Sequence, residues 1–244
     1  MTSFPTEEVS IPTQGLIYPK THPFSSGKVK MKYMTAKEED ILSNENYMDK
    51  GIVLDKLLES LLVTDEKVDV ASIFPGDKMA LLVAARVLGY GKMYEFNYKN
   101  ESYKVDLTQL KEQILDPLII NEYGEVKYDF YDTDNTVTFK FLNEKDLKLI
   151  EEEIKGITKA LGTTPPTVTT RLKYQVQSIN GSRDKNEIKT LSENILARDS
   201  RELRDYMNKI EPQVFLTFED KEGKERDLPF GAVGFFYPHL LKMA

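Results

Sequence analysis

The chain has 244 residues, of which 40% are hydrophobic, 30% charged and 10% aromatic. This length supports one large domain or two small ones, and the composition excludes collagen-like, mucin-like and globally disordered proteins. Cysteine is absent, which excludes disulfides, thiolate metal sites and a cysteine nucleophile. The formal net charge of −7 disfavours binding to a phosphate backbone unless basic residues gather on one face.

Targeting and metal signals are weak in this sequence. No apolar run approaches the roughly 20 residues that span a bilayer, and the N-terminus lacks the basic and apolar regions of a secretory signal. We therefore expect no membrane segment and a cytosolic protein. His22 and His239 lie near opposite ends, so a zinc site would depend on carboxylates, which is uncommon. We expect no metal and no cofactor.

The N-terminal part of the chain predicts an arm followed by a strand. Residues 9–23 combine apolar residues with Pro and Gly, which predicts an extended arm or edge strand rather than a helix. Residues 27–34 alternate Lys with apolar side chains, the period-two pattern of a half-buried strand. Thr35 and Glu38 then have the spacing of a capping box at a helix start.

Two further helices are predicted before the chain changes to strands. Residues 51–62 carry apolar side chains at spacings of three and four, which predicts a helix with a wide apolar stripe. A third helix is expected from Asp77, as the N-cap, to the stop at Gly89 and Gly91. Alternating aromatic residues then predict a hairpin over residues 94–107.

The middle of the chain predicts strands and then a helix. Aromatic strands are expected at about residues 126–131 and 136–141. Asn143 is expected to cap an amphipathic helix that ends at Gly162. A boundary or hinge is expected over residues 162–167, which contain two prolines.

The last third predicts helices and a closing hairpin. Two helices are expected to meet near residues 197–200, with Asp199 or Ser200 capping the second. Residues 214–230 predict a hairpin. Residues 77–107 and 200–230 form a weak internal echo, each a capped helix followed by a hairpin, which indicates either an old duplication or coincidence.

Together these elements predict an α+β fold, in which helical units combine with antiparallel β-hairpins behind an extended, Pro-rich N-terminal arm. We expect three parts. Residues 1–34 form the arm and a strand, residues 35–162 form a domain of helices plus a hairpin, and residues 163–244 form a helix-plus-hairpin domain with an apolar C-terminal anchor.

No catalytic constellation is recognisable in the sequence. Gly89 and Gly91 end a helix instead of opening one, so they do not form a phosphate-binding loop. No Gly-x-Ser-x-Gly elbow occurs. The acidic clusters at residues 38–40 and 151–153 are explained as helix starts and solvated helix faces. We expect a protein that is not an enzyme.

Several blocks of sequence occur in an order that resembles a known family. They are PTQGLIYP (12–19), MKYMTAKEEDIL (31–42), GIVLDKLL (51–58), PGDK (75–78), ARVLGYG (85–91), ARDSRELR (197–204), LPF (228–230) and FFYP (235–238). The ordered set resembles the baseplate hub assembly proteins, or hub assembly chaperones, of T-even-type contractile-tailed bacteriophages. The resemblance spans residues 9–240 and is weakest over residues 112–170.

The resemblance implies a non-enzymatic role in building the hub of the phage tail baseplate, in the host cytoplasm, through contacts with other hub or tail proteins. Whether the protein leaves after assembly or remains in the virion stays open, as does a homo-oligomer. Relatives often carry Cys pairs, typical of a zinc ribbon, in their hairpins. Here the corresponding turns, residues 99–101 and 220–224, contain none, which removes a zinc expectation.

Three segments are candidate partner-binding sites, and core packing is the alternative for each. They are the N-terminal arm (Leu16, Ile17 and Tyr18), the charged helix (Arg198, Arg201, Arg204 and Tyr206) and the C-terminal anchor (Phe235, Phe236 and Tyr237). Arg and aromatic side chains are enriched where proteins meet. The alternative function is a phage nucleic-acid-binding module that uses Lys28, Lys30 and Lys32 with the hairpin aromatics.

Overall fold

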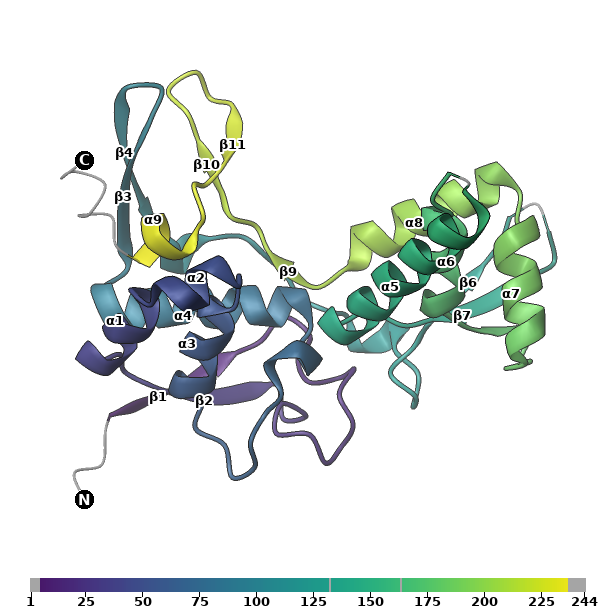
Figure 1. Cartoon of the computed structure of the whole chain (residues 1–244), viewed down its shortest axis with the longest axis horizontal. Helices are drawn as coiled ribbons and strands as arrows, with labels where there is room; N and C mark the ends of the chain where they lie inside the picture. Colours follow the sequence, from purple (N-terminus) through teal and green to yellow (C-terminus); the bar gives the residue numbers. More distant parts are fainter. Residues whose placement is uncertain (1–4, 132, 163, 237–244) are drawn as a thin grey trace.

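The chain folds into two lobes joined by a narrow pair of strands (Figure 1). The computed structural model describes residues 5–131, 133–162 and 164–236. Within this part, helices combine with antiparallel sheets of two or three strands. The predicted α+β class is therefore confirmed.

The first lobe contains residues 5–109 and 217–236, so it is built from both ends of the described chain. Its strands are β1 (Thr6–Ser10), β2 (Lys28–Lys32), β3 (Met93–Tyr98), β4 (Glu101–Asp106), β10 (Thr217–Glu219) and β11 (Glu225–Asp227). Its helices are α1 (Ala36–Leu42), α2 (Glu45–Asp49), α3 (Val53–Leu61), η1 (Val70–Ser72), α4 (Pro75–Tyr90), η2 (Leu107–Gln109) and α9 (Ala232–Phe236).

The second lobe contains residues 117–210 and is continuous in sequence. Its three-stranded sheet has the order β6-β7-β8 and is flanked by helices. The elements are η3 (Pro117–Ile119), β6 (Val126–Asp129), β7 (Thr136–Phe139), α5 (Glu144–Leu161), α6 (Thr167–Gln175), β8 (Val176–Ile179), α7 (Lys185–Asn194) and α8 (Ala197–Ile210).

Two short strands connect the lobes. The chain leaves the first lobe through β5 (Glu112–Gln113) and returns through β9 (Gln213–Val214), and these strands pair antiparallel, with Glu112 opposite Val214. We call residues 110–116 and 211–216 the connector. Because both crossings lie side by side, the second lobe is an insertion into the first.

The buried side chains form two hydrophobic clusters that follow this division. The first extends from Ile11 to Phe236, and the second from Leu115 to Met207. Residues 5–34 and 35–109 share one core, whereas residues 163–236 contribute to both. The predicted divisions at residues 34/35 and 162/163 therefore do not coincide with the edges of the two cores.

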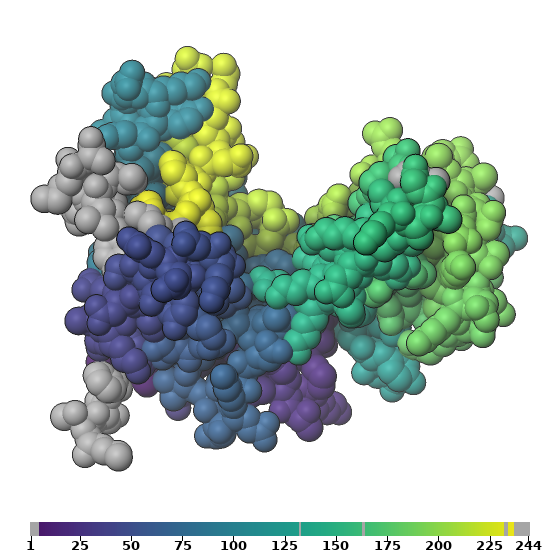
Figure 2. Space-filling model, in the orientation of Figure 1, coloured from purple at the N-terminus to yellow at the C-terminus, as the bar shows by residue number. Residues whose placement is uncertain are grey.

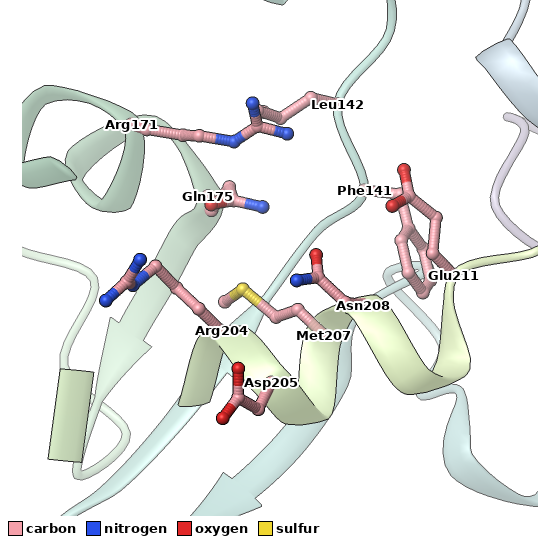
Figure 3. A pocket seen from close by; sticks show the side chains of 9 residues that line it. All are labelled: Phe141, Leu142, Arg171, Gln175, Arg204, Asp205, Met207, Asn208 and Glu211. Atoms are coloured by element: carbon pink, nitrogen blue, oxygen red, sulfur yellow. The ribbon is translucent and has the colours of Figure 1, made fainter. Parts of the chain in front are cut away.

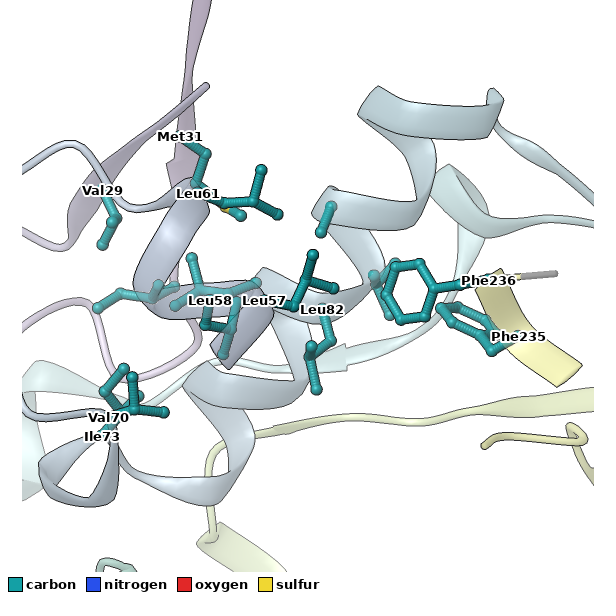
Figure 4. Close-up of a cluster of buried hydrophobic side chains, with 14 of the residues drawn as sticks. Val29, Met31, Leu57, Leu58, Leu61, Val70, Ile73, Leu82, Phe235 and Phe236 are labelled. Atoms are coloured by element: carbon teal, nitrogen blue, oxygen red, sulfur yellow. The ribbon is translucent and has the colours of Figure 1, made fainter. Parts of the chain in front are cut away.

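The core of the first lobe surrounds helices α3 and α4. Figure 4 shows strand, helix and C-terminal side chains that meet there, although they come from residues far apart in sequence. The stripe predicted over residues 51–62 supplies Val53, Leu57, Leu58 and Leu61, all buried. On β2, Val29 and Met31 are buried while Lys28 and Lys30 are exposed, as the alternation predicts.

The capping box at Thr35 and Glu38 is present and extends into a buried network. Glu38 accepts hydrogen bonds from the Thr35 amide and hydroxyl at 2.8 and 2.7 Å, from Ser60 at 2.6 Å and from Lys32 at 2.9 Å. Burial alone would raise the pKa of this carboxyl, but the hydrogen bonds outweigh it and lower the pKa to about 2. The network thereby joins β2, α1 and α3.

The predicted helix at Asn143 is also confirmed, with a capping box to Asp146 and a left-handed C-cap at Gly162. Two other helix starts differ from prediction. Helix α4 begins at Pro75, because proline's fixed φ suits the first helical position, and Asp77 lies inside its first turn instead of capping it. Helix α8 begins at Ala197, so Asp199 lies within its first turn and is buried.

The Pro-rich segment over residues 9–23 is not an extended arm. It is a strand only to Ser10, where β1 pairs with β2, and then runs through successive turns. Gly15 and Gly27, both with positive φ, pack so closely that a Cβ on either would lie 2.5–2.6 Å from the other turn's backbone. Tertiary contacts thus override the local preference of proline for extended chain.

The two predicted hairpins stand side by side on the first lobe (Figure 1). Phe218 of β10 packs against Phe96, Tyr98 and Tyr103 of the β3–β4 hairpin, with ring centroids 4.9–5.5 Å apart. An ion pair of 2.9 Å between Lys221 and Glu101 links the two turns. The helices of the internal echo, α4 and α8, lie in different lobes, so the two segments are not equivalent units.

Helix α4 approaches the connector so closely that only glycine fits. A Cβ on Gly76 would lie 1.9 Å from the carbonyl oxygen of Pro212, a backbone atom that cannot rotate away. We predict that Gly76→Ala lowers the free energy of unfolding by at least about 2 kcal/mol. Urea unfolding of the purified variant measures this change.

The matched control is Gly156→Ala, in the interior of α5 with no atom within 4 Å of the added Cβ. Because glycine is unfavourable within a helix, this variant should be more stable than the wild type by about 0.5–1 kcal/mol. Equal stability of the two variants would contradict close packing at Gly76.

Candidate partner-binding surfaces

The N-terminal candidate residues lie at a buried junction. The Tyr18 hydroxyl donates to Oδ2 of Asp77 at 2.7 Å and accepts from the Phe74 amide at 3.2 Å. The Thr13 hydroxyl donates to the same oxygen at 2.7 Å, and the Thr13 amide donates to Oδ1 at 3.0 Å. Tyr18 is therefore a structural residue that holds the N-terminal turns against α4.

Burial dominates the electrostatics of Asp77, which is fully buried. It raises the pKa of this carboxyl to about 6, although the hydrogen bonds from Thr13 and Tyr18 act in the opposite direction. Burial next to Asp77 also raises the pKa of Tyr18. The hydroxyl of Tyr18 therefore stays protonated and available as a donor.

Leu16 and Ile17 lie at the seam between the lobes. Both are partly buried and pack against the core of the second lobe, and Ile17 also packs against that of the first. Nearby, the Leu115 amide donates to the carbonyl of Pro12, and the Gln14 side chain donates to the carbonyl of Leu115, both at 2.9 Å. This part of the predicted arm therefore contacts the chain's own second lobe.

Ion pairs also link the two lobes at this seam. Lys78 on α4 contacts Asp55 in its own lobe and Glu144 at the start of α5 in the other. Lys145 pairs with Asp69 at 2.7 Å. The half-buried pair of Lys78 with Glu144 opposes separation of the lobes more than the exposed Lys145 pair does, because water screens the latter.

The C-terminal candidates Phe235 and Phe236 are fully buried in the core of the first lobe. Nε of Arg86 donates to the carbonyl of Phe235 at 2.9 Å, and the Phe235 ring packs against Tyr94 with centroids 5.1 Å apart. These two residues of the predicted anchor are therefore packed inside the chain's own core. Tyr237, the third predicted residue, and His239 lie outside the described residues.

The charged helix α8 presents two different faces. Arg198 and Arg201 are exposed, and Arg201 pairs with Asp205 at 3.6 Å, the predicted i,i+4 pair. Tyr206 is partly buried against Tyr128, with ring centroids 5.1 Å apart. Arg204 is half-buried, and its Nε donates to the carbonyl of Ser200 at 3.1 Å.

Arg204 also lines a pocket of about 270 Å³ between α6, α8 and the segment that follows β7 (Figure 3). The lining residues are Phe141, Leu142, Arg171, Gln175, Arg204, Asp205, Met207, Asn208 and Glu211. Of the predicted site residues, Arg204 alone lines this pocket. Sequence reasoning missed Arg171, Gln175, Asn208 and Glu211, because only the packing of α6 against α8 brings them together.

Exposed apolar side chains gather on the second lobe. Among the described residues, the large hydrophobic side chains that are exposed are Val63, Ile114, Leu118, Tyr123, Tyr131, Leu149, Leu161, Val168 and Leu196. Val63 belongs to the first lobe and Ile114 to the connector. The other seven lie on the second lobe, where Leu118 and Tyr131 are more than 90% exposed. Figure 2 shows the face between the β10–β11 hairpin and this lobe as a hollow.

The lysine strand is partly neutralised by nearby acids. Lys30 lies opposite Glu8 in the β1–β2 ladder, and Lys32 pairs with Glu38 at 2.9 Å. The hairpin aromatics pack on one another. Lys32 and the hairpin rings, which the nucleic-acid alternative requires, are therefore engaged within the chain, while Lys28 and Lys30 are exposed.

Residues 5–131, 133–162 and 164–236 lack metal-binding and membrane-spanning features. Within these ranges, His, Cys, Asp and Glu side chains form no group of three or more that could hold a metal ion. No helix in the same ranges has the length and apolar character needed to cross a membrane.

Comparison of the chain with protein-family models, curated proteins and solved structures finds no match.

The Asp77 carboxyl makes stability depend on pH. Since its pKa is about 6 in the fold and about 4 in the unfolded chain, its protonated form stabilises the fold, and this contribution is lost as pH rises through 6. One pKa unit corresponds to about 1.4 kcal/mol, so the loss approaches about 3 kcal/mol.

We predict that Asp77→Asn, which keeps the shape but cannot ionise, removes this dependence. The measurement is the free energy of urea unfolding of wild type minus variant between pH 4 and pH 7, which should fall as pH rises. A difference that stays constant over this range would show that the Asp77 carboxyl does not titrate in it.

For the C-terminal residues, we predict that Phe235→Ala combined with Phe236→Ala unfolds the first lobe. Each substitution removes a buried ring and costs about 3–5 kcal/mol, so together they approach the whole stability of a typical domain. Near-ultraviolet circular dichroism and thermal unfolding detect the loss. Leu161→Ala with Leu196→Ala, at exposed positions, is the control and should leave Tm unchanged. If the double variant folds normally, the two rings are not essential to the core, and the hypothesis that they bind a partner would be favoured.

Proposed function

We propose that the chain is a baseplate hub assembly protein of a contractile-tailed phage, acting as a chaperone or structural subunit through protein–protein contacts and without catalysis. Its partners would be other hub or tail proteins, in the host cytoplasm during tail assembly. No observation in the structure favours the nucleic-acid alternative.

The observation that carries this proposal is that sequence blocks of the resemblance contact one another in the first lobe. The block at residues 12–19 binds the block at 75–78, through Thr13 and Tyr18 to Asp77. The block at 85–91 binds the block at 235–238, through Arg86 to the Phe235 carbonyl. Blocks that build one shared core are expected if the resemblance reflects a common fold, and not if it were a set of unrelated short matches.

The distribution of exposed apolar surface supports the same proposal. Apart from the block at 197–204, the blocks lie in the first lobe, whereas the segment where the resemblance is weakest, residues 112–170, lies mostly in the second. Among the described residues, the second lobe also carries most of the exposed large hydrophobic side chains, which supply apolar area for contact with a partner. We assign scaffolding to the first lobe and partner contact to the second.

The test combines mass spectrometry of purified virions with an affinity pull-down of the tagged chain from lysate of infected cells. Hub subunits in the pull-down, with the chain absent from virions, would identify an assembly chaperone. Stoichiometric presence in virions would identify a structural component. Absence of hub subunits from the pull-down, together with absence of the chain from virions, would refute the proposal.

A variant pair tests the role of the second lobe. Leu118→Ser with Tyr131→Ser removes the two most exposed apolar side chains, so recovery of hub subunits should fall while Tm stays unchanged. Val63→Ser, on the first lobe, is the control and should leave recovery unchanged. Equal loss in both variants would contradict the assignment of partner contact to the second lobe.

A further inference from the structure

The pocket beside α8 contains polar groups that the chain does not satisfy. Gln175 is 8% exposed, yet its side-chain amide has no hydrogen-bond partner among the described residues, and it points into the pocket (Figure 3). The amide is open to water in the pocket, so an acceptor that enters the pocket can replace water as its partner. The amide of Asn208 faces the same space. Both amides are positioned to donate to an acceptor that enters the pocket.

Two guanidinium groups border the same space. Arg171 reaches over Gln175, and Arg204 stands at one rim (Figure 3). Within the part of the chain that the structure describes, neither forms an ion pair with a carboxylate; Arg204 bonds only the Ser200 carbonyl, through Nε. A guanidinium presents a planar fork of donors that matches a carboxylate. The pocket therefore combines four side chains that donate hydrogen bonds.

Two carboxylates limit the charge that the pocket accepts. Asp205 forms an ion pair with Arg201, which does not line the pocket. Glu211 lies at the rim opposite Arg204. Burial raises the pKa of Glu211, and Arg171 opposes that effect. A phosphate, with up to two negative charges, would be repelled by these groups more strongly than a single carboxylate would. A peptide N–H beside a bound carboxylate would find an acceptor in Glu211.

The apolar lining also favours a peptide. Phe141, Leu142 and Met207 are buried side chains that border the pocket, and they suit the methylene groups or an apolar neighbour of an acidic residue. The volume of about 270 Å³ is below the roughly 300–1,000 Å³ of pockets that enclose a drug-sized ligand. It fits one or two residues of a chain.

We propose that this pocket binds a carboxylate of a partner protein, supplied by an Asp or Glu side chain or by a free C-terminus. Arg171 and Arg204 hold the charge, Gln175 and Asn208 donate to it, and Phe141, Leu142 and Met207 contact the adjoining carbons. This binding mode requires only an acidic peptide, so it is independent of the baseplate assignment.

The test is a nuclear magnetic resonance titration of the full, isotopically labelled chain with three acetylated glycine-leucine-X tripeptides. In the first, X is glutamate with an amidated end; in the second, X is glutamine with a free end; in the third, X is glutamine with an amidated end and no carboxylate. The amide resonances of Gln175 and Asn208 should shift with at least one of the first two peptides and not with the third. The first two peptides distinguish a side chain from a C-terminus.

Variants locate the binding. Arg171→Gln and Arg204→Gln should each weaken the binding about tenfold, because each removes one charge-assisted interaction. Arg198→Gln, the same change at an exposed position of the same helix, should leave the affinity unchanged. Gln175→Leu should weaken binding without lowering Tm, since the lost amide has no partner within the chain. Arg171 is exposed, so its variant is expected to fold even if Arg204→Gln does not.

Three outcomes would overturn the proposal. The neutral peptide could bind as tightly as the charged ones, which would indicate an apolar pocket. Inorganic phosphate could bind more tightly than either carboxylate peptide, which would indicate a phosphate site. Arg198→Gln could weaken binding as much as Arg171→Gln, which would indicate unspecific charge attraction. None of these outcomes depends on the virion and pull-down results.

Discussion

The first turn of α4 is the constraint on which the arrangement of the molecule depends. Gly76 abuts the connector, Asp77 binds the N-terminal turns, and Lys78 reaches the second lobe. Three consecutive residues thus fix three separate parts of the chain around one helix end. Because burial outweighs the hydrogen bonds from Thr13 and Tyr18, the surroundings of the Asp77 carboxyl disfavour its charged form.

Glu38 and Asp77, two buried acids of the first lobe, have pKa values that their surroundings shift in opposite directions. Glu38 is joined to Lys32, so its negative charge is compensated and its pKa is low. Asp77 accepts hydrogen bonds from the Thr13 and Tyr18 hydroxyls, but burial outweighs them and raises its pKa to about 6. Acidification therefore weakens the contribution of Glu38 while strengthening that of Asp77. The stability contributed by the two acids therefore falls on both sides of a maximum near pH 4, as pH drops for Glu38 and as pH rises for Asp77.

Local structure was largely predictable from the sequence, whereas the assembly of the lobes was not. Capping boxes at Thr35 and Asn143 and the stripe in α3 depend on spacing within one segment, and the structure confirms them. The insertion of the second lobe rests on pairing between β5 and β9, two strands of two residues about 100 positions apart. The pocket at Gln175 arises from two helices whose individual sequences carry no signal for it. Contacts between residues far apart in the chain produce no regular spacing in the sequence, so the sequence does not predict them.

The discontinuity of the first lobe also has a consequence for synthesis on the ribosome. All residues of the second lobe emerge before strands β10 and β11, so this lobe holds a complete core while the first still lacks Phe218, Phe235 and Phe236. Until that last segment arrives, the part of α4 that packs against α9 remains uncovered, and Nε of Arg86 lacks its acceptor, the carbonyl of Phe235. The order of translation therefore makes completion of the first lobe a late step, in which residues 217–236 must return to the core begun by residues 5–109.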